Sequence, residues 1–355
     1  MTQEDSDVVS TEAVLWAFRY FIGREPADDQ EIAFHRQHGN LESLRTAFAQ
    51  TREFADYLRN LRKPRTYCIP MFLIQPPVDP TVHWRFAPPR LAEPVSQMCT
   101  GSQFEEGTFG DWCAAMDIPR AIHRKVWEFC FVLAALDAGG MLKVGNRGLG
   151  FGVGQEPLPA LLAQRGLTIT ATDAPMDVEA AQGWGCSGQH ASGLEAMDRP
   201  TVLPFERLRE RVAFRFVDMN VIPDDISGYD FCWSSCALEH LGSLEHGLRF
   251  VQESLRTLRP GGYAVHTTEL NLSSNEATLE HPSLSLYRKK DIEAVAARLV
   301  AAGHHVSPLN FHPGDTLVDE YIDLPPYASP HLKLELDQYV TTSFGLVVRK
   351  GDSGA

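Results

Sequence analysis

Strand-like and helix-like segments alternate along the last two thirds of this 355-residue chain. Strand patterns rich in β-branched and aromatic residues cover residues 167–172, 212–217, 229–235 and 263–268. One intervening helical pattern places on a single face Leu244, Leu248, Val251, Leu255 and Leu258. Such alternation is typical of a sheet whose strands are joined by crossover helices. The pattern therefore predicts an α/β domain over residues 121–355.

The first 120 residues divide into two further parts. In residues 1–62 apolar side chains recur at helical spacing, and Asn40 and Thr51 are typical helix N-caps, so we expect a small all-α domain. Residues 63–120 instead interleave nine prolines with aromatic side chains. A plain polar linker carries few aromatics. We therefore expect this segment to be an arm or lid that lies on the α/β domain.

Composition limits the partners and the location of the protein. The 32 Lys and Arg and the 46 Asp and Glu give a net charge of -14, which repels nucleic acid and anionic membrane surfaces. No apolar run approaches the ~20 residues of a membrane helix. Residues 1–10 are acidic and polar rather than basic and then apolar, so we expect a cytoplasmic location. The seven cysteines are scattered without a CxxC pair, which favours reduced thiols over disulfides or a zinc site.

A glycine-rich turn follows the first strand-like segment of the α/β domain. Residues 147–157 have the pattern of a short strand, a glycine loop and the start of a helix. Glycines let a ligand approach the backbone closely, and a helix N-terminus offers unpaired N–H groups. The next strand ends in Asp173, 21 positions after Gly152. A carboxylate at that place can accept hydrogen bonds from both ribose hydroxyls of a nucleoside cofactor.

The loop does not complete the GxGxxG pattern of nicotinamide-binding proteins. Gln155 follows the second glycine, and Pro157 stands where the third glycine is needed. A nicotinamide cofactor is therefore disfavoured.

Four features of this domain occur in a fixed order, namely the loop Phe151–Gly154, Asp173 after the second strand, Asp218 after the third, and the turn Arg259–Gly262 before the fifth. Together they resemble the class I S-adenosylmethionine-dependent methyltransferases, over residues 121–350. The resemblance implies an α/β fold with a Rossmann-like methyltransferase sheet of seven strands, the last of them antiparallel. Residues 338–348 suit that last strand.

The same resemblance implies that S-adenosylmethionine is the cofactor. The residues that it places at the cofactor are Gly152, Gly154, Asp173, Ala174, Asp218, Met219 and Ser234. The two glycines line the methionine part, Asp173 holds the ribose, and Asp218 with Met219 faces adenine.

The chain departs from the family pattern at two positions of the loop. The family usually has an acid two residues before the first glycine and a third glycine four residues after it, but this chain has Gly150 and Glu156 there. Glu156, at a helix start where negative charge is favoured, can accept a bond from the ammonium of the cofactor. The alternative is an ordinary carboxylate in the first helical turn.

A candidate base follows the fourth strand, at the sheet edge where ligands of open α/β folds bind. His240 lies there, and an imidazole can take the proton of a hydroxyl acceptor near neutral pH. Glu239 can orient His240 or bind the acceptor. The alternative is that His240 only caps or packs against the following helix.

Other polar and aromatic residues are weaker candidates. Glu239, His266, Glu269, Asn271 and His281 together offer oxygen and nitrogen ligands, but their spacing is not diagnostic, so we expect no metal and assign Glu269 to substrate. Trp184 can stack on a substrate or simply pack in the core. Gln103, in the arm, is either part of a lid over the cofactor or an ordinary loop residue.

The N-terminal helical segment suggests the class of acceptor. Residues 21–26 (FIGREP) and 54–58 (FADYL) resemble a small bacterial helical domain of unknown function that is attached to glycan-related enzymes. The function expected from both resemblances is O-methylation of a sugar or glycan precursor, a small-molecule or glycan acceptor. The alternatives are N-methylation of a small metabolite or peptide, and a catalytically silent cofactor-binding module of the same fold.

Overall fold

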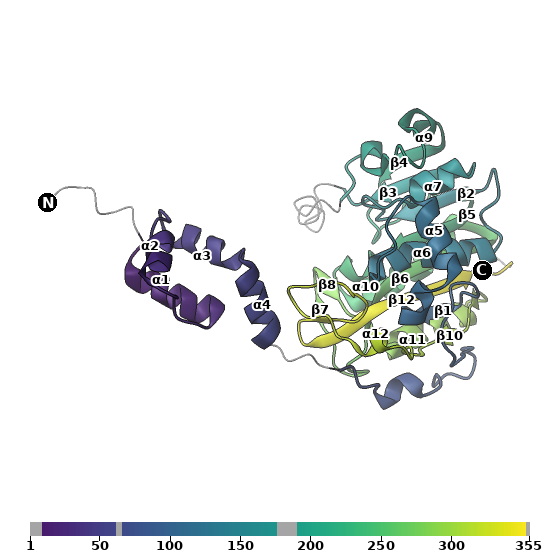
Figure 1. Ribbon diagram of the computed structural model, residues 1–355. Helices are drawn as coiled ribbons and strands as arrows, with labels where there is room; N and C mark the ends of the chain where they lie inside the picture. The colour runs from purple at the N-terminus through teal and green to yellow at the C-terminus, as the bar shows by residue number, and fades with distance from the viewer. Residues whose placement is uncertain (1–8, 62–65, 176–189, 353–355) are drawn as a thin grey trace. The chain divides into compact units, whose positions relative to one another are not determined.

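The chain forms two compact units, Met1–Arg65 with Leu324–Ala328 and Thr66–Asp323 with Ser329–Ala355. The computed structural model describes residues 9–61, 66–175 and 190–352. Figure 1 shows the helices of the first unit and the sheet of the second. Trp184, one of the candidate substrate residues, lies outside the described residues.

The first unit is all-helical in its described part. Its elements are α1 (Thr11–Ala17), the π-helical turn η1 (Phe18–Ile22), α2 (Asp29–His35), α3 (Leu41–Ala49) and α4 (Arg52–Leu61). Asn40 accepts a hydrogen bond from the Ser43 N–H at 2.8 Å, and Thr51 accepts one from Phe54 at 3.0 Å, so both predicted N-caps are confirmed. The helices enclose a core of their own, formed by Val9, Val14, Ala17, Phe18, Ile22, Leu44 and Phe48.

This separate core leads to a prediction about stability. Because the buried side chains of the first unit pack on one another, we expect a chain that begins at Thr66 to keep a cooperative unfolding transition. Calorimetric melting of the truncated and full chains tests this. A truncated chain that melts without a cooperative transition contradicts the prediction.

The second unit is built on a large mixed sheet (Figure 1). Its parallel strands are β2 (Arg147–Phe151), β3 (Thr168–Asp173), β4 (Val212–Phe216), β5 (Tyr229–Ser235) and β6 (Leu258–Asn271). The strand β12 (Tyr339–Arg349) pairs with β6 in the antiparallel direction. The order across the sheet is β12-β6-β5-β2-β3-β4. The predicted Rossmann-like sheet with an antiparallel last strand is therefore confirmed.

The sheet is wider than the seven strands predicted, because short strands join it at β12 and beyond. These are β1 (Ser96–Met98), β9 (His305–Val306), β10 (Leu309–Asn310) and β11 (Leu334–Leu336). The strand β1 pairs antiparallel with β12 and parallel with β10. Since β1 comes from the segment 63–120, part of that arm is built into the sheet.

Helices cover both faces of the sheet. On one face lie α5 (Gly107–Ala115), α6 (Arg124–Ala138) and α7 (Leu158–Gln164), packed with strand residues such as Trp233 and Val265 in the main core. The other face contacts α10 (Leu244–Ser254), whose Phe250 meets Phe151 and His266 edge to face. The remaining elements are η2 (Met71–Ile74), η3 (Gly101–Phe104), η4 (Leu194–Met197), α9 (Phe205–Arg211), η5 (Leu238–His240), η6 (Leu255–Thr257), β7 (Glu280–His281), β8 (Leu284–Ser285), α11 (Lys289–Ala301) and α12 (Leu317–Glu320).

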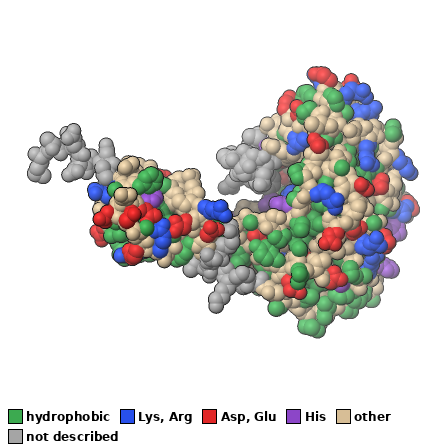
Figure 2. Space-filling view, in the orientation of Figure 1, with side chains coloured by type: hydrophobic (Ala, Val, Ile, Leu, Met, Phe, Trp, Pro, Cys, Tyr) green, Lys and Arg blue, Asp and Glu red, His purple; other side chains and the backbone are tan. Residues whose placement is uncertain are grey.

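The structure can be compared with the expectations about charge, membrane helices and cysteines that the composition raised. Acidic and basic side chains are intermixed on the second unit in the view of Figure 2. Within the described part of the chain, no helix combines the length and the apolar character needed to span a bilayer. The described cysteines Cys68, Cys99, Cys113, Cys130, Cys232 and Cys236 are unbridged, as predicted, and Cys186 falls outside the described residues.

Candidate active site

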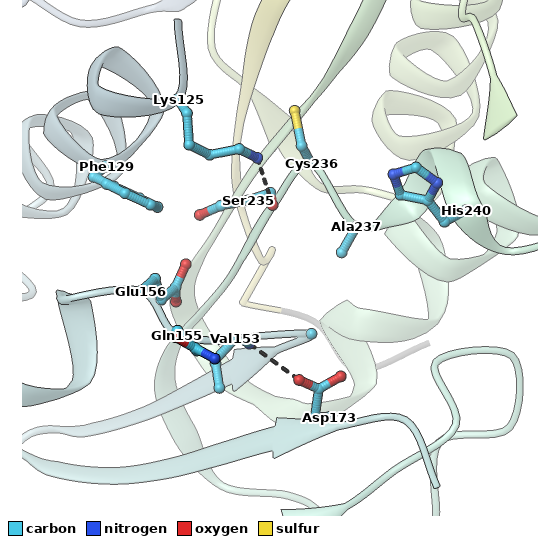
Figure 3. A pocket seen from close by; sticks show the side chains of 12 residues that line it. Lys125, Phe129, Val153, Gln155, Glu156, Asp173, Ser235, Cys236, Ala237 and His240 are labelled. Atoms are coloured by element: carbon cyan, nitrogen blue, oxygen red, sulfur yellow. Dashed lines mark hydrogen bonds between the residues drawn. The ribbon is translucent and has the colours of Figure 1, made fainter. Parts of the chain in front are cut away.

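A cavity of about 280 Å³ opens where the carboxyl ends of β2, β3 and β5 meet (Figure 3). From β2 the chain continues to β3 and β4 on one side, and later returns through β5 to β6 on the other. Ligands of open α/β sheets bind at such a reversal of strand order. The cavity is lined by Lys125, Phe129, Gly152, Val153, Gly154, Gln155, Glu156, Asp173, Ser235, Cys236, Ala237 and His240.

The glycine turn forms one wall of the cavity and requires its glycines. Gly152 and Gly154 have φ angles of 58° and 50°, which side chains rarely adopt. A Cβ atom at Gly152 would lie 2.9 Å from the Cβ of Ala237 and 3.5 Å from the sulfur of Met219. A side chain at either glycine would therefore strain the backbone, and at Gly152 it would also crowd Ala237.

Asp173 ties this turn to the end of β3. Its side chain is buried, and it accepts backbone N–H bonds from Gly154 at 3.1 Å, Ala174 at 2.8 Å and Ala191 at 2.9 Å. Burial raises the pKa of Asp173, and the three N–H bonds oppose that shift. A carboxylate offers about four acceptor positions, so capacity for a ligand hydroxyl remains.

The residues predicted to face adenine lie beside the turn. Met219 is nearly buried, and its sulfur approaches Gly152. Asp218 accepts a hydrogen bond from the Asn220 N–H at 2.8 Å, which fixes the chain after β4. Neither these two residues nor Ala174 belongs to the described lining of the cavity, although Met219 adjoins it at Gly152 and Ala174 at Asp173.

The missing acid at position 150 has a structural reason. A Cβ atom at Gly150 would lie 2.5 Å from the indole ring of Trp233, so no side chain fits there. The same indole donates a hydrogen bond from Nε1 to Glu156 Oε1 at 2.5 Å. Trp233 thus excludes an acid before the glycine turn and holds the carboxyl of Glu156 on the cavity wall.

Glu156 is held in an environment that disfavours its charge. Burial raises its pKa to about 8, although the Trp233 bond and the nearby Lys125 charge oppose the shift. At neutral pH the carboxyl is therefore mostly protonated. A ligand ammonium beside it would stabilise the carboxylate, so the proton would be released on binding. An ammonium contact at Glu156 and a purely structural role of this residue therefore predict different proton release when a ligand binds.

We expect the binding of S-adenosylhomocysteine (SAH) at pH 7 to release up to one proton from Glu156, given a pKa of about 8 before binding. The affinity should rise with pH up to about 8, because the carboxylate form becomes populated. Calorimetry in buffers of different ionisation enthalpy measures this release, and Glu156→Gln is the variant that should lose it. If the neutral variant binds SAH as tightly as the parent, Glu156 does not contact the ammonium.

His240 lies on the opposite side of the cavity, in η5 directly after β5 (Figure 3). Its Nδ1 is 2.5 Å from the Ser283 carbonyl oxygen. A carbonyl only accepts, so Nδ1 carries the proton in the neutral imidazole and Nε2 carries the lone pair. This tautomer is the one that a base acting through Nε2 requires.

Glu239 is not among the described residues that line the cavity. It is buried, and its Oε2 accepts a hydrogen bond from Thr268 Oγ1 at 3.1 Å. Its Oε1 has no hydrogen-bond partner among the described residues.

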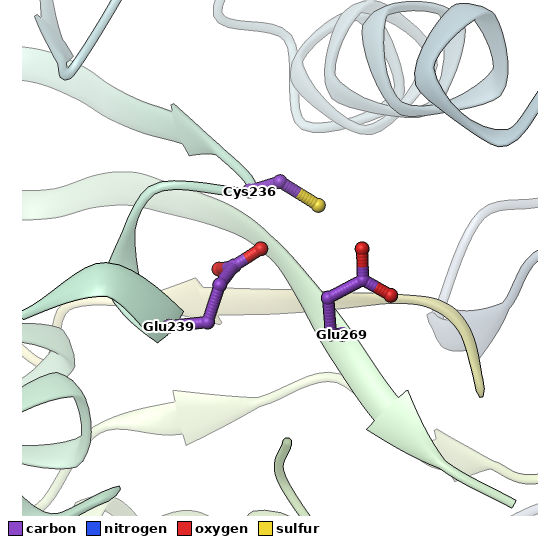
Figure 4. A group of neighbouring side chains, drawn as sticks. All are labelled: Cys236, Glu239 and Glu269. Carbon is purple, nitrogen blue, oxygen red and sulfur yellow. The ribbon is translucent and has the colours of Figure 1, made fainter. Parts of the chain in front are cut away.

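Glu239 is one of three ligand-bearing side chains that converge under the cavity (Figure 4). One ligand atom from each of Cys236, Glu239 and Glu269 lies within 4.8 Å of the others. Arg124 forms an ion pair with Glu269 and lies 3.4 Å from Glu128 Oε1. Burial raises the pKa of Glu269, and the charge of Arg124 opposes this. The positive charge in this cluster is supplied by the guanidinium, and we assign no metal to it.

The predicted cofactor residue Ser234 lies away from the cavity. Ser234 bonds to His266 Nδ1 at 2.8 Å on the α10 face of the sheet, because successive strand residues point to opposite faces. Its neighbour Ser235 is the one on the lining. The same alternation places His266 and Glu269 on opposite faces of the sheet. The predicted set of oxygen and nitrogen ligands is therefore divided between the two faces.

Gln103 is fully buried in η3 and is not a lid residue. Its Oε1 accepts bonds from Gln97 Nε2 at 2.7 Å and Trp127 Nε1 at 2.9 Å, and its Nε2 donates to the Met98 carbonyl at 2.9 Å. These bonds join the arm to α6, so the residue has a structural role in this fold.

Sequence reasoning missed the contribution of α6. Lys125 and Phe129 line the cavity from this helix, and Arg124 and Glu128 lie beneath it. The available signal was charge at positions 124, 125 and 128 at the start of an otherwise apolar helix. Charged residues are rarely buried unless they are paired, and such groups often mark a site.

Comparisons with known proteins place few constraints on this chain. No protein-family model and no curated protein matches the sequence. Solved structures similar to it include a complex of DhpI with SAH (16% identity, 62% of this chain and 85% of that chain, TM-score 0.36). Another is magnesium protoporphyrin IX methyltransferase from Synechocystis with bound SAH (14%, 62% and 80%, 0.37). A third is the N-terminal domain of EvdMO1 with SAH and D-fucose (12%, 61% and 81%, 0.38). The fold assignment rests on the strand order of this chain itself.

Proposed function

We propose that this protein is an S-adenosylmethionine-dependent methyltransferase that acts on an oxygen of a sugar or glycan precursor. One observation carries the proposal: the glycine turn after β2 and the acid at the end of β3 are hydrogen-bonded to each other at the cavity where strand order reverses. A nucleoside ligand needs such a side-chain-free loop next to a carboxylate for its ribose.

Several residues of this chain fit the parts of the cofactor. Asp173 takes the ribose hydroxyls, the glycine turn lies along the methionine part, and Glu156 takes the ammonium. Asp218 and Met219, after β4, face adenine. When bound, S-adenosylmethionine supplies an activated methyl group on a sulfonium.

The protein contributes mainly alignment and a proton acceptor. Attack in line with the breaking bond needs the acceptor held against the methyl group and shielded from water. A hydroxyl must lose its proton as the methyl group arrives, and His240 accepts that proton at Nε2 while the Ser283 carbonyl holds Nδ1. Glu239, buried beside Cys236, orients His240 or binds the acceptor.

The class of acceptor rests on an association. The helical first unit resembles domains that accompany glycan-related enzymes, and this supports a sugar or glycan precursor as the acceptor. The base at the cavity supports oxygen over nitrogen, because a neutral amine attacks without first losing a proton.

Activity assays test the proposal directly. The purified protein is incubated with S-adenosylmethionine and a panel of sugars, nucleotide sugars, amines and peptides, while SAH release is followed. We expect release with a hydroxyl acceptor and a product 14 mass units heavier, because a CH₃ group replaces one hydrogen. Release with amines alone contradicts O-methylation, and an absence of release with every acceptor favours the silent binding module.

A further inference from the structure

A lysine that the sequence did not single out faces the candidate cofactor cavity. Lys125 lies in the first turn of α6, and its side chain is 38% exposed. Its Nζ donates to Glu128 Oε2 at 3.0 Å and lies 3.5 Å from the Ser235 carbonyl oxygen. An ammonium has three N–H groups, and these two contacts are its hydrogen bonds to the described residues. One N–H group therefore remains for a ligand.

A buried carboxylate, itself held by further hydrogen bonds, fixes the position of the Lys125 ammonium. Glu128 is fully buried, and it accepts further bonds from Ser343 Oγ at 2.6 Å and Cys236 Sγ at 2.9 Å. Arg124 is a second cation beside the same carboxylate. Since Arg124 also pairs with Glu269, the contact with Glu128 serves to position the ammonium of Lys125 at the cavity.

The cavity wall formed by Lys125 and Glu156 carries an ammonium and a carboxyl group. Figure 3 shows the two side chains on the same side of the cavity, with Ser235 between them. Lys125 comes from α6, and Glu156 from the turn before α7. An ammonium beside a carboxyl is complementary to the zwitterionic end of an α-amino acid, which presents a carboxylate and an ammonium on one carbon.

We propose that Lys125 binds the carboxylate at the amino-acid end of the cofactor, next to Glu156, which takes its ammonium. This inference rests on the proposed function, and it assigns a residue to the cofactor end that the altered loop pattern at Gly150 leaves without its usual acid. Two contacts to one carbon also fix the direction in which the sulfonium, three bonds further along the chain of the cofactor, faces the acceptor side.

The assignment has a consequence for ligand selectivity. SAH carries the amino-acid end, whereas 5′-methylthioadenosine has the same adenosine and sulfur without it. Loss of the Lys125 charge should therefore weaken SAH and leave 5′-methylthioadenosine unchanged. A purely structural role of Lys125 would not distinguish the two ligands.

Calorimetric titration of the full chain with each ligand tests the proposal. We expect Lys125→Met to weaken SAH by about 10- to 100-fold, the usual effect of removing a charge-assisted hydrogen bond, without changing the affinity for 5′-methylthioadenosine. Lys125→Arg should retain most of the SAH affinity. Lys143→Met, which removes an exposed lysine elsewhere, is the matched control and should bind both ligands as the parent does.

The remaining outcomes overturn the assignment in different ways. If Lys125→Met binds SAH as tightly as the parent, Lys125 does not contact the carboxylate. If the variant loses both ligands equally, Lys125 supports the shape of the cavity and not the amino-acid end. If the parent binds neither ligand, the proposed function itself is wrong. Retained binding of 5′-methylthioadenosine also shows that a variant is folded.

Discussion

Replacing His240 with alanine is expected to lower the turnover of methyl transfer to a hydroxyl by about 10²- to 10⁴-fold, the usual contribution of a general base. The reason is that the hydroxyl proton must leave as the methyl group arrives, and the proposed mechanism assigns its uptake to the imidazole of His240. The affinity for SAH should barely change. Steady-state kinetics and calorimetry on the same preparation measure the two quantities.

A second histidine serves as the control, because removing an imidazole outside the cavity should not lower turnover. His305 is exposed in β9 and is not on the described lining of the cavity, so His305→Ala should keep the turnover of the parent. Two results would return His240 to a structural role. One is a His240→Ala variant with most of its turnover, and the other is a loss of SAH binding in proportion to the loss of rate. Glu239 or Glu269 would then be the candidate for the general base.

The second large effect is expected at Asp173. Asp173→Ala should weaken SAH binding by about 1.5–3 kcal/mol, roughly 10- to 150-fold, because charge-assisted bonds to the ribose are lost. The variant also removes the acceptor of the Gly154 N–H, so the glycine turn loses one of its restraints. Titration calorimetry with SAH measures the change.

The control for this variant removes an acid of the same type. Asp137→Ala changes an exposed residue near the end of α6 and should leave SAH affinity unaltered. If Asp173→Ala binds SAH with the affinity of the parent, Asp173 is excluded from the cofactor site and serves only to join β3 to the turn.

The parts of the site that the sequence could predict are those that follow directly after strands. Gly152 and Asp173 each lie at the carboxyl end of a parallel strand, so the pattern of strands alone brings them to one edge of the sheet. The antiparallel β12 was expected from the resemblance to the methyltransferases, with residues 338–348 as the segment that suits it.

Other parts depend on contacts that local sequence does not specify. Ser234 and Ser235 differ by one position, and the alternation of the strand decides that Ser235 faces the cavity. Lys125 reaches the cavity only because α6 packs on the same face of the sheet. The role of Gly150 depends on Trp233 from a neighbouring strand, 83 positions away in the sequence. Packing between distant segments fixes the last two.

A crystal structure of the full chain with SAH is the most direct test of the central claim that this cavity is a cofactor site. The account predicts the ribose against Asp173, the amino-acid end between Lys125 and Glu156, and the sulfur facing His240. SAH bound elsewhere on the protein, or an empty cavity at saturating SAH, would contradict it.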